Sequence, residues 1–275
     1  MEQLHHSLWI VEFVNRLLGP LVAPLLGRTY EPGMTVIPDY LVMCALIVLL
    51  VTVFSLFIRS RLSVDNPGKL QIVVEDIVGF LVGILKDNVG PQGVKYLPLV
   101  GTIFIFIFLG NMFGKVPGLM SPTASLNVTL GCAITVWVYY HLQGVKVQGI
   151  GNYVLHFLFP PGVPKVMGPL VGLIEVISHT SRVLSLSLRL FGNVFGEELV
   201  VLILASLVPF LVPLPMMLLG VITGSLQAFI FALLTVIYIA GAVHVDHAHD
   251  DAHSGDEAAA DHVHGTSLAH SAPAA

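Results

Sequence analysis

The side chains with the clearest capacity for chemistry lie in the run from Glu175 to Asn193, inside a strongly apolar region. Polar residues recur there at steps of three or four positions: Glu175, Ser178, Arg182, Ser185, Arg189 and Asn193. On an α-helix this spacing places them on one face, while leucine, isoleucine, valine and phenylalanine occupy the others. Ionisable groups at bilayer depth are typical of ion and proton pathways, so the pattern indicates proton or ion movement.

Arg189 is the most unusual residue of this stripe. Leu186, Leu188, Leu190 and Phe191 surround it, and no charged residue lies one helical turn away. An arginine keeps its proton and is costly within a bilayer, so it needs a carboxylate partner or a water-filled cavity. We therefore expect its counter-charge to come from a more distant part of this chain or from another chain. The alternative is a buried polar seam between helices, which suits the serines but not the formal charges.

The carboxylates around Arg189 are distributed in a way that favours proton transfer. Glu175 precedes it by fourteen residues and lies within about 40° of the same helical face, whereas Glu198 follows by nine residues, about half a turn away. This arrangement fits two aqueous half-channels divided by a fixed positive charge, because arginine, with a pKa above about 12, cannot pass a proton on. Glu197 is expected to be an interfacial or solvated carboxylate.

The composition restricts the fold class. Of the 275 residues 55% are hydrophobic and only 11% are charged, compared with about 25% charged residues in soluble domains. The sequence therefore predicts an all-α polytopic membrane protein, with several transmembrane helices and a C-terminal helix hairpin. No basic run suggests nucleic acid, and we find no motif for covalent catalysis or for a cofactor. Cys44 and Cys132 lie in apolar spans and are expected to be small core residues.

Three regions are expected along the chain: an N-terminal interfacial or external segment (1–38), a membrane domain (39–243) and a disordered tail rich in His and Asp (244–275). The apolar segments of the membrane domain are Leu41–Ile58, Tyr96–Phe113, Leu126–His141, the proline-free run from Leu170 to Val208, and Met216–Val243. Leu70–Leu85 carries two acidic residues and predicts an amphipathic helix or hairpin arm. Residues 151–168 are rich in proline and predict a re-entrant or surface segment.

The segment that carries Arg189 is too long for a simple span. Its roughly 40 residues would form a helix of about 60 Å, twice the thickness of the hydrocarbon. Either the helix breaks at Gly192 and Gly196 or it is strongly tilted, and the sequence leaves both possibilities open. Pro209, Pro213 and Pro215 predict the turn before the last helix, which would return as a hairpin.

Basic residues predict the orientation of the chain. Arg59, Arg61 and Lys69 follow the first span, and Lys146 and Lys165 follow the third. The positive-inside rule places both loops in the cytoplasm, so the N-terminus lies outside and the hairpin returns the tail to the cytoplasm. The tail is expected to hold no metal, because its histidines form a low-complexity tract without cysteine.

Three motifs resemble one known family. They are Ser-Leu-Arg-Leu-Phe-Gly-Asn (187–193), Leu-Gln-Ala-Phe-Ile-Phe (226–231) and Pro-Thr-Ala-Ser-Leu-Asn-Val-Thr-Leu (122–130). The chain is similar to subunit a of the F-type ATP synthase from about Leu41 to Val243. The resemblance implies a stator subunit that moves protons, with a long, tilted C-terminal hairpin that cups a rotating ring of c subunits. It also implies a bacterial inner-membrane location, contact with the b subunit of the peripheral stalk, no cofactor, and no catalysis by this chain itself.

The resemblance assigns a role to each matching residue. Arg189 would face the ion-carrying carboxylate of the c-ring and block a short circuit between the half-channels. Glu198, Asn193 and Gln227 would lie near it, with Glu198 in the outer access half-channel and Asn111 further along that path. The residues that would line the cytoplasmic exit are Glu175, Ser178 and Ser185.

Simpler interpretations stay open for some of these residues. Gln227 could form a hydrogen bond between helices, Ser178 and Ser185 could serve packing, and Asn111 could cap or anchor a helix end. One position departs from the family: some members carry a histidine seven residues before the glutamine, where this chain has Gly220. The access path would then depend on Glu198 and water.

Two functions of other classes compete with the stator. A self-contained secondary transporter with an anionic substrate bound at Arg189 predicts internal repeats, and we find none. A membrane metalloenzyme would need histidines within the spans, whereas most of the histidines of this chain lie in the tail.

Overall fold

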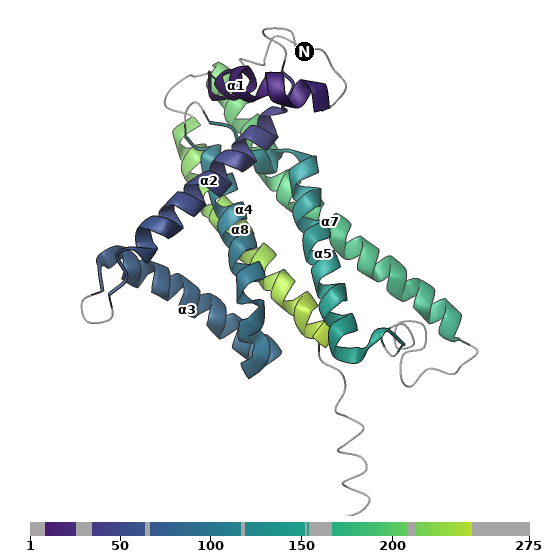
Figure 1. The fold of residues 1–275 in the computed structure, drawn as a ribbon. Coiled ribbons are helices and arrows are strands. Elements are labelled where there is room, and N and C mark those ends of the chain that lie inside the picture. Colours follow the sequence, from purple (N-terminus) through teal and green to yellow (C-terminus); the bar gives the residue numbers. More distant parts are fainter. Residues whose placement is uncertain are drawn as a thin grey trace, which may run out of the picture.

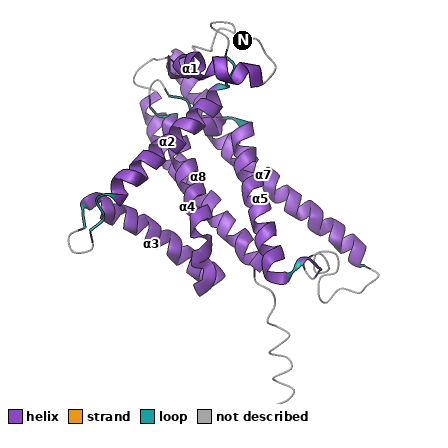
Figure 2. Ribbon diagram, in the orientation of Figure 1, coloured by secondary structure: helices purple, strands orange, loops and turns teal. Residues whose placement is uncertain are grey.

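The computed structural model describes residues 9–25, 35–63, 67–116, 119–151, 153, 167–207 and 213–243. Within these residues the chain is helical and contains no strand (Figures 1 and 2). The helices are α1 (Trp9–Leu25), α2 (Asp39–Arg59), α3 (Lys69–Val89), α4 (Leu97–Phe113), α5 (Leu126–Gln148), α7 (Gly168–Leu207) and α8 (Pro213–Val243), with short 3-10 turns η2 (Pro91–Tyr96) and η3 (Pro122–Ala124). The predicted all-α fold class is confirmed.

Helix α8 is the centre of the arrangement. It contacts α3, α4, α5 and α7. Helix α2 leads away from the bundle, α3 returns to it, and α1 lies across one end of it (Figure 1). The buried residues of α8 recur every three or four positions, and Gly220, Gly224 and Ala228 are among them. A Cβ atom on Gly224 would lie 3.1 Å from the Cβ of Asn111, so the absence of a side chain lets α4 and α8 approach closely.

A single polar side chain ties α1 to the start of α2. Asn15 is buried; its Oδ1 accepts hydrogen bonds from the backbone N–H groups of Val36 (3.0 Å) and Ile37 (2.8 Å). Its Nδ2 donates to the carbonyl oxygens of Val11 (3.0 Å) and Ile37 (3.2 Å). The expected interfacial segment therefore contains a helix that is fixed against the end of the bundle; its depth in a membrane stays a prediction.

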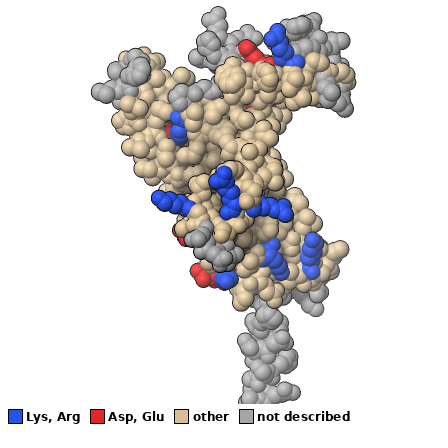
Figure 3. Space-filling view, turned by 60° about the vertical axis from the view of Figure 1, so that its left-hand side comes forward, with Lys and Arg blue, Asp and Glu red and all other residues tan. Residues whose placement is uncertain are grey.

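Four helical segments of the described chain are long and apolar enough to cross a membrane: Asp39–Arg59, Pro91–Phe113, Leu170–Leu207 and Pro213–Val243. Large apolar side chains are exposed along them, and Figure 3 shows a described surface that is mostly neither acidic nor basic. Helix α5 is not among the four. It continues seven residues beyond the expected His141, to Gln148, and its 23 residues measure about 35 Å. That α5 crosses the membrane stays a prediction.

The structure resolves the two possibilities for the long segment. Helix α7 is continuous through Gly192 and Gly196 over 40 residues, about 60 Å, and it lies inclined to α5 and antiparallel to α8 (Figure 1). The final helix begins at Pro213, three residues earlier than expected, so Pro213 and Pro215 belong to its first turn rather than to the connection. Proline fits there because the first helical N–H groups have no partner within the helix. Pro209, nearly all of residues 151–166, and the tail lie outside the described residues.

Candidate functional site

Arg189 lies on the outer face of α7. Leu186, Leu190 and Val194, four residues apart, are buried against the bundle, whereas Arg189 and its neighbour Leu188 are exposed. Within the part of the chain that the structure describes, no hydrogen bond or ion pair engages Arg189. That its counter-charge comes from another chain stays a prediction. A buried seam between helices does not fit an exposed guanidinium.

Toward the C-terminal end of α7, Glu197 forms an ion pair with Lys115, which follows α4. The two side chains are only 16% and 12% exposed, respectively. Of the two expectations for Glu197, a solvated carboxylate is therefore wrong, and an interfacial position stays a prediction. The sequence does not show this pairing, because Lys115 and Glu197 are 82 residues apart and meet only when α4 packs beside the hairpin.

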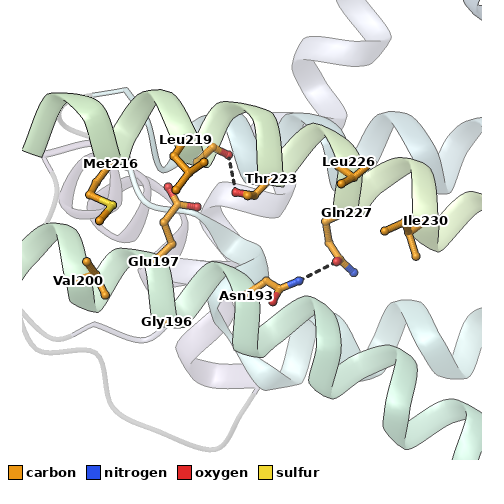
Figure 4. A pocket seen from close by; sticks show the side chains of 11 residues that line it. Asn193, Gly196, Glu197, Val200, Met216, Leu219, Thr223, Leu226, Gln227 and Ile230 are labelled. Carbon is orange, nitrogen blue, oxygen red and sulfur yellow. Dashed lines mark hydrogen bonds between the residues drawn. The ribbon is translucent and has the colours of Figure 1, made fainter.

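Gly220 explains where the Glu197 carboxylate lies. A side chain at position 220 would collide with that carboxylate, which occupies the space directly over the glycine. Figure 4 shows Glu197 between α7 and α8, at the edge of a pocket of about 370 Å³ that Thr223 and Gln227 also line. The departure from the family at Gly220 thus coincides with a carboxylate from α7 that fills the space.

Glu198 also lies at the end of α4. It follows Val194 by four residues on the inward side of α7 and is half-buried. A Cβ atom on Gly114, just after α4, would lie 2.9 Å from Glu198 Oε1. The two consecutive carboxylates therefore both reach the turn after α4, and Glu197 in addition lies over Gly220 of α8.

Asn111 is the centre of a buried hydrogen-bond network near Glu198. Its Nδ2 donates to the carbonyl oxygen of Gly224 on α8 (2.8 Å), and its Oδ1 accepts from the hydroxyl of Thr123 in η3 (2.7 Å). The Thr123 hydroxyl also lies 2.8 Å from that of Ser121, which donates to the carbonyl oxygen of Gly110 (2.8 Å). These contacts favour an anchoring role for Asn111, and its place on a proton path stays a prediction.

Asn193 and Gln227, which were both expected to lie near Arg189, contact each other across the hairpin. Asn193 Nδ2 donates to Gln227 Oε1 at 2.8 Å (Figure 4). Gln227 is only 3% exposed, and its Nε2 finds no hydrogen-bond partner among the described residues. One half of the Gln227 amide therefore joins two helices, and the other half is left to donate beside the pocket.

The opposite end of α7 holds a second polar cluster. Glu175 Oε1 lies 3.0 Å from His179 Nε2, and the other ring nitrogen of His179 lies 2.8 Å from the Tyr140 hydroxyl of α5. Ser178 is half-buried beside Glu175, whereas Ser185 is exposed and donates to the carbonyl oxygen of its own turn. His179 and Tyr140 are not among the residues predicted from the sequence, although the spacing of four residues between Glu175 and His179 is a signal for their contact.

Glu175 and Glu198 lie on opposite sides of Arg189 along one helix, about 21 Å and about 14 Å away by helical rise. No group of three metal-ligating side chains occurs in the described residues. The fold and these clusters define a class: a polytopic helical membrane protein with ionisable groups placed along its spans for the movement of a small ion.

The particular family follows from comparison with known proteins. A family described as ATP synthase A chain matches residues 40–240. The chain is 43% identical to ATP synthase subunit a 1 of Pelobacter propionicus over 242 residues, 88% of this chain and 99% of that protein. It is also 43% identical to ATP synthase subunit a of Citrifermentans bemidjiense (89% and 99% covered), and 44% identical to that of a Sulfurihydrogenibium species (75% and 98%).

The chain belongs to the ATP synthase A chain family. It is a membrane protein and a component of the ATP synthase complex, which it forms with other subunits. The family is the proton-translocating stator subunit of the membrane sector, so the secondary transporter is not favoured.

Proposed function

We propose that this chain conducts protons through two half-channels that end on either side of Arg189, and that it performs no covalent chemistry itself. The observation that carries the proposal is the exposed guanidinium of Arg189, which has no partner among the described residues and lies between two polar clusters. A proton cannot pass through arginine, so it must leave this chain on one side and return on the other.

The outer half-channel is assigned to the cluster that joins α4, α7 and α8. Glu198 would receive protons there, with Asn193 and Gln227 between it and Arg189 and Asn111 behind it. The support is proximity: Glu198 lies beside the end of α4, and the Asn193 to Gln227 hydrogen bond is one helical turn from Arg189.

The exit half-channel is assigned to the cluster at the start of α7. Glu175 is 39% exposed, so it can release protons to water, and Ser178 and Ser185 continue from it toward Arg189 on the same face. These serines could also serve packing alone, and replacing each with alanine separates the two roles, since only a path residue slows proton flux.

The partner of Arg189 is assigned to the c-ring. Leu184 and Leu188 beside it are 51% and 54% exposed, so an apolar helix can cover this face and bring a carboxylate to the guanidinium. The two charges would then pair away from water, where an ion pair is much stronger than at a surface. Moving one charge across about 100 mV supplies about 2.3 kcal/mol to drive such a cycle.

The b subunit is a further proposed partner, and the exposed side of α2 is the surface that we would test. Six apolar residues of α2 line an open groove of about 450 Å³, with Val53 and Phe57 among them. Disulfide cross-linking of Val53→Cys to single cysteines in the membrane helix of b tests the contact, and failure at every position of that helix would exclude this surface.

We place the chain in the bacterial inner membrane with its N-terminus outside and its tail in the cytoplasm. Support comes from Arg59 and Arg61 at the end of α2 and from Lys146 near the end of α5. The Gln148 side chain donates to the carbonyl oxygen of Ala242 (3.2 Å), so α8 ends on the same side as α5. Labelling of Ile150→Cys by an impermeant maleimide should occur from the cytoplasmic side, and labelling from outside would reverse the orientation.

The central experiment replaces Arg189 with alanine in the whole complex. ATP-driven proton pumping and proton-driven ATP synthesis in membrane vesicles should both be lost, while the chain still co-purifies with the other subunits. Leu188→Ala is the matched control, because Leu188 is an exposed neighbour on the same helix without charge. Coupled synthesis at the normal rate in the Arg189→Ala complex would refute the proposed function.

A further inference from the structure

The cluster at the start of α7 contains a continuous hydrogen-bonded chain. Tyr140 Oη lies 2.8 Å from His179 Nδ1, and His179 Nε2 lies 3.0 Å from Glu175 Oε1. An ionised carboxylate can only accept, so Nε2 carries the proton toward Glu175. With a neutral ring, Nδ1 then accepts from the Tyr140 hydroxyl. The imidazole thus connects a hydroxyl of α5 to a carboxylate of α7.

The hydrogen-bonded series Tyr140, His179 and Glu175 leads from the interior toward the surface. Tyr140 is only 2% exposed, the His179 side chain is 13% exposed, and the Glu175 side chain is 39% exposed. His179 precedes Arg189 by ten residues, about 15 Å of helix, and lies about 80° from its face, toward α5. A proton held on His179 would therefore be deeper in the protein than one on Glu175 and closer to Arg189.

Other ionisable groups lie around the imidazole. The His141 ring lies 5.1 Å from the His179 ring, centroid to centroid, and its own Nδ1 lies 2.9 Å from the carbonyl oxygen of Trp137. Further titratable and charged groups surround these contacts. They are Arg182 on α7, His141 on α5, Tyr238 on α8 and Tyr153, which follows α5. Arg182 Cζ is 5.3 Å from the centre of the Tyr238 ring.

We propose that His179 carries protons between Tyr140 and Glu175 in the exit half-channel, which rests on the proposed function above. As a proton reaches Tyr140 Oη, the hydroxyl passes its own proton to His179 Nδ1, and Nε2–H passes its proton to Glu175 Oε1. Each group gives one proton for each that it receives, so no tyrosinate forms. Glu175 then releases the proton to water. Loss of a proton from Nδ1 of the imidazole and return of one to Nε2 by exchange with water restore the starting tautomer. The reverse sequence serves ATP-driven pumping.

The test compares His179→Gln with His141→Gln in the complete membrane sector reconstituted into vesicles. Glutamine can accept from Tyr140 and donate to Glu175, so it keeps the hydrogen bonds but cannot relay a proton through its side chain. We expect passive proton flux, followed with a pH-sensitive dye under an imposed potential, to fall about tenfold or more in His179→Gln. His141→Gln should conduct normally, because His141 lies beside the chain of contacts and not within it.

The outcomes distinguish a proton relay through His179 from a packing role and from failure of the stator function. Wild-type flux in His179→Gln overturns the relay and leaves the stator function standing if Arg189→Ala still abolishes coupled pumping. An equal loss in His141→Gln assigns the effect to packing of the cluster and also overturns the relay. If His179→Gln does not assemble with the c-ring, Tyr140→Phe replaces it: reduced flux in an assembled complex supports the proposal, and wild-type flux refutes it.

Discussion

Adding a single methyl group at position 220 should destabilise the hairpin, because Gly220→Ala displaces the Glu197 carboxylate. The oxygen that the new Cβ would meet is Oε1, the atom that pairs with Lys115. Separating a buried ion pair costs about 3–5 kcal/mol, and the lower value applies here because the pair is slightly exposed. Alanine regains about 1 kcal/mol over glycine within a helix. The free energy of unfolding should therefore fall by about 2 kcal/mol.

The measurement is equilibrium unfolding of the purified chain in mixed micelles with increasing dodecyl sulfate. Gly241→Ala is the control in the same helix, because its Cβ would meet no atom within 4 Å, and it should be neutral or stabilising. In a Glu197→Ala background Gly220→Ala should cost nothing, so the two changes are strongly non-additive. If Gly220→Ala is as stable as Gly241→Ala, or costs the same in both backgrounds, Glu197 does not occupy the space over Gly220.

Two further substitutions test the outer cluster. Glu198→Gln keeps the size of the side chain but removes its ability to carry a proton, so ATP-driven proton pumping should slow by about tenfold or more; unchanged pumping in the assembled complex would remove Glu198 from the path. Asn111→Leu breaks hydrogen bonds to Gly224 and Thr123 and should lower the free energy of unfolding by about 2 kcal/mol. Wild-type stability combined with slower pumping would instead make Asn111 a path residue and not an anchor.

The sequence predicted the fold wherever hydrophobicity alone determines it. The apolar runs that form α2, α4 and α8 were located to within three residues, because burial in lipid requires a long uninterrupted segment. Continuity of α7 could not be predicted, since glycine weakens a helix without necessarily breaking it. Packing against α5 and α8 keeps the helix intact through Gly192 and Gly196.

The candidate site was predictable along one helix and not between helices. The periodicity of α7 correctly separated the face of Arg189 from that of Glu198. The Lys115 to Glu197 pair and the contact of Tyr140 with His179 depend on which helices become neighbours, and residues 82 and 39 positions apart give no periodic signal. The sequence shows glycine at position 220, where some family members carry histidine. That the Glu197 carboxylate occupies this space could be seen only in the structure.

The unusual length of α7 follows from the arrangement it must hold. Glu175 and Glu198 are 23 residues apart, about 34 Å of helix, which already exceeds the thickness of the hydrocarbon. An upright span of about 20 residues could not carry a polar cluster at each end, place Arg189 between them and still begin and end in flanking turns. A break at Gly192 would leave Glu198 and Arg189 on separate segments, free to move relative to one another. A continuous helix fixes the order of Glu175, Arg189 and Glu198 along its axis, so the two proposed half-channels keep a constant separation on either side of the arginine.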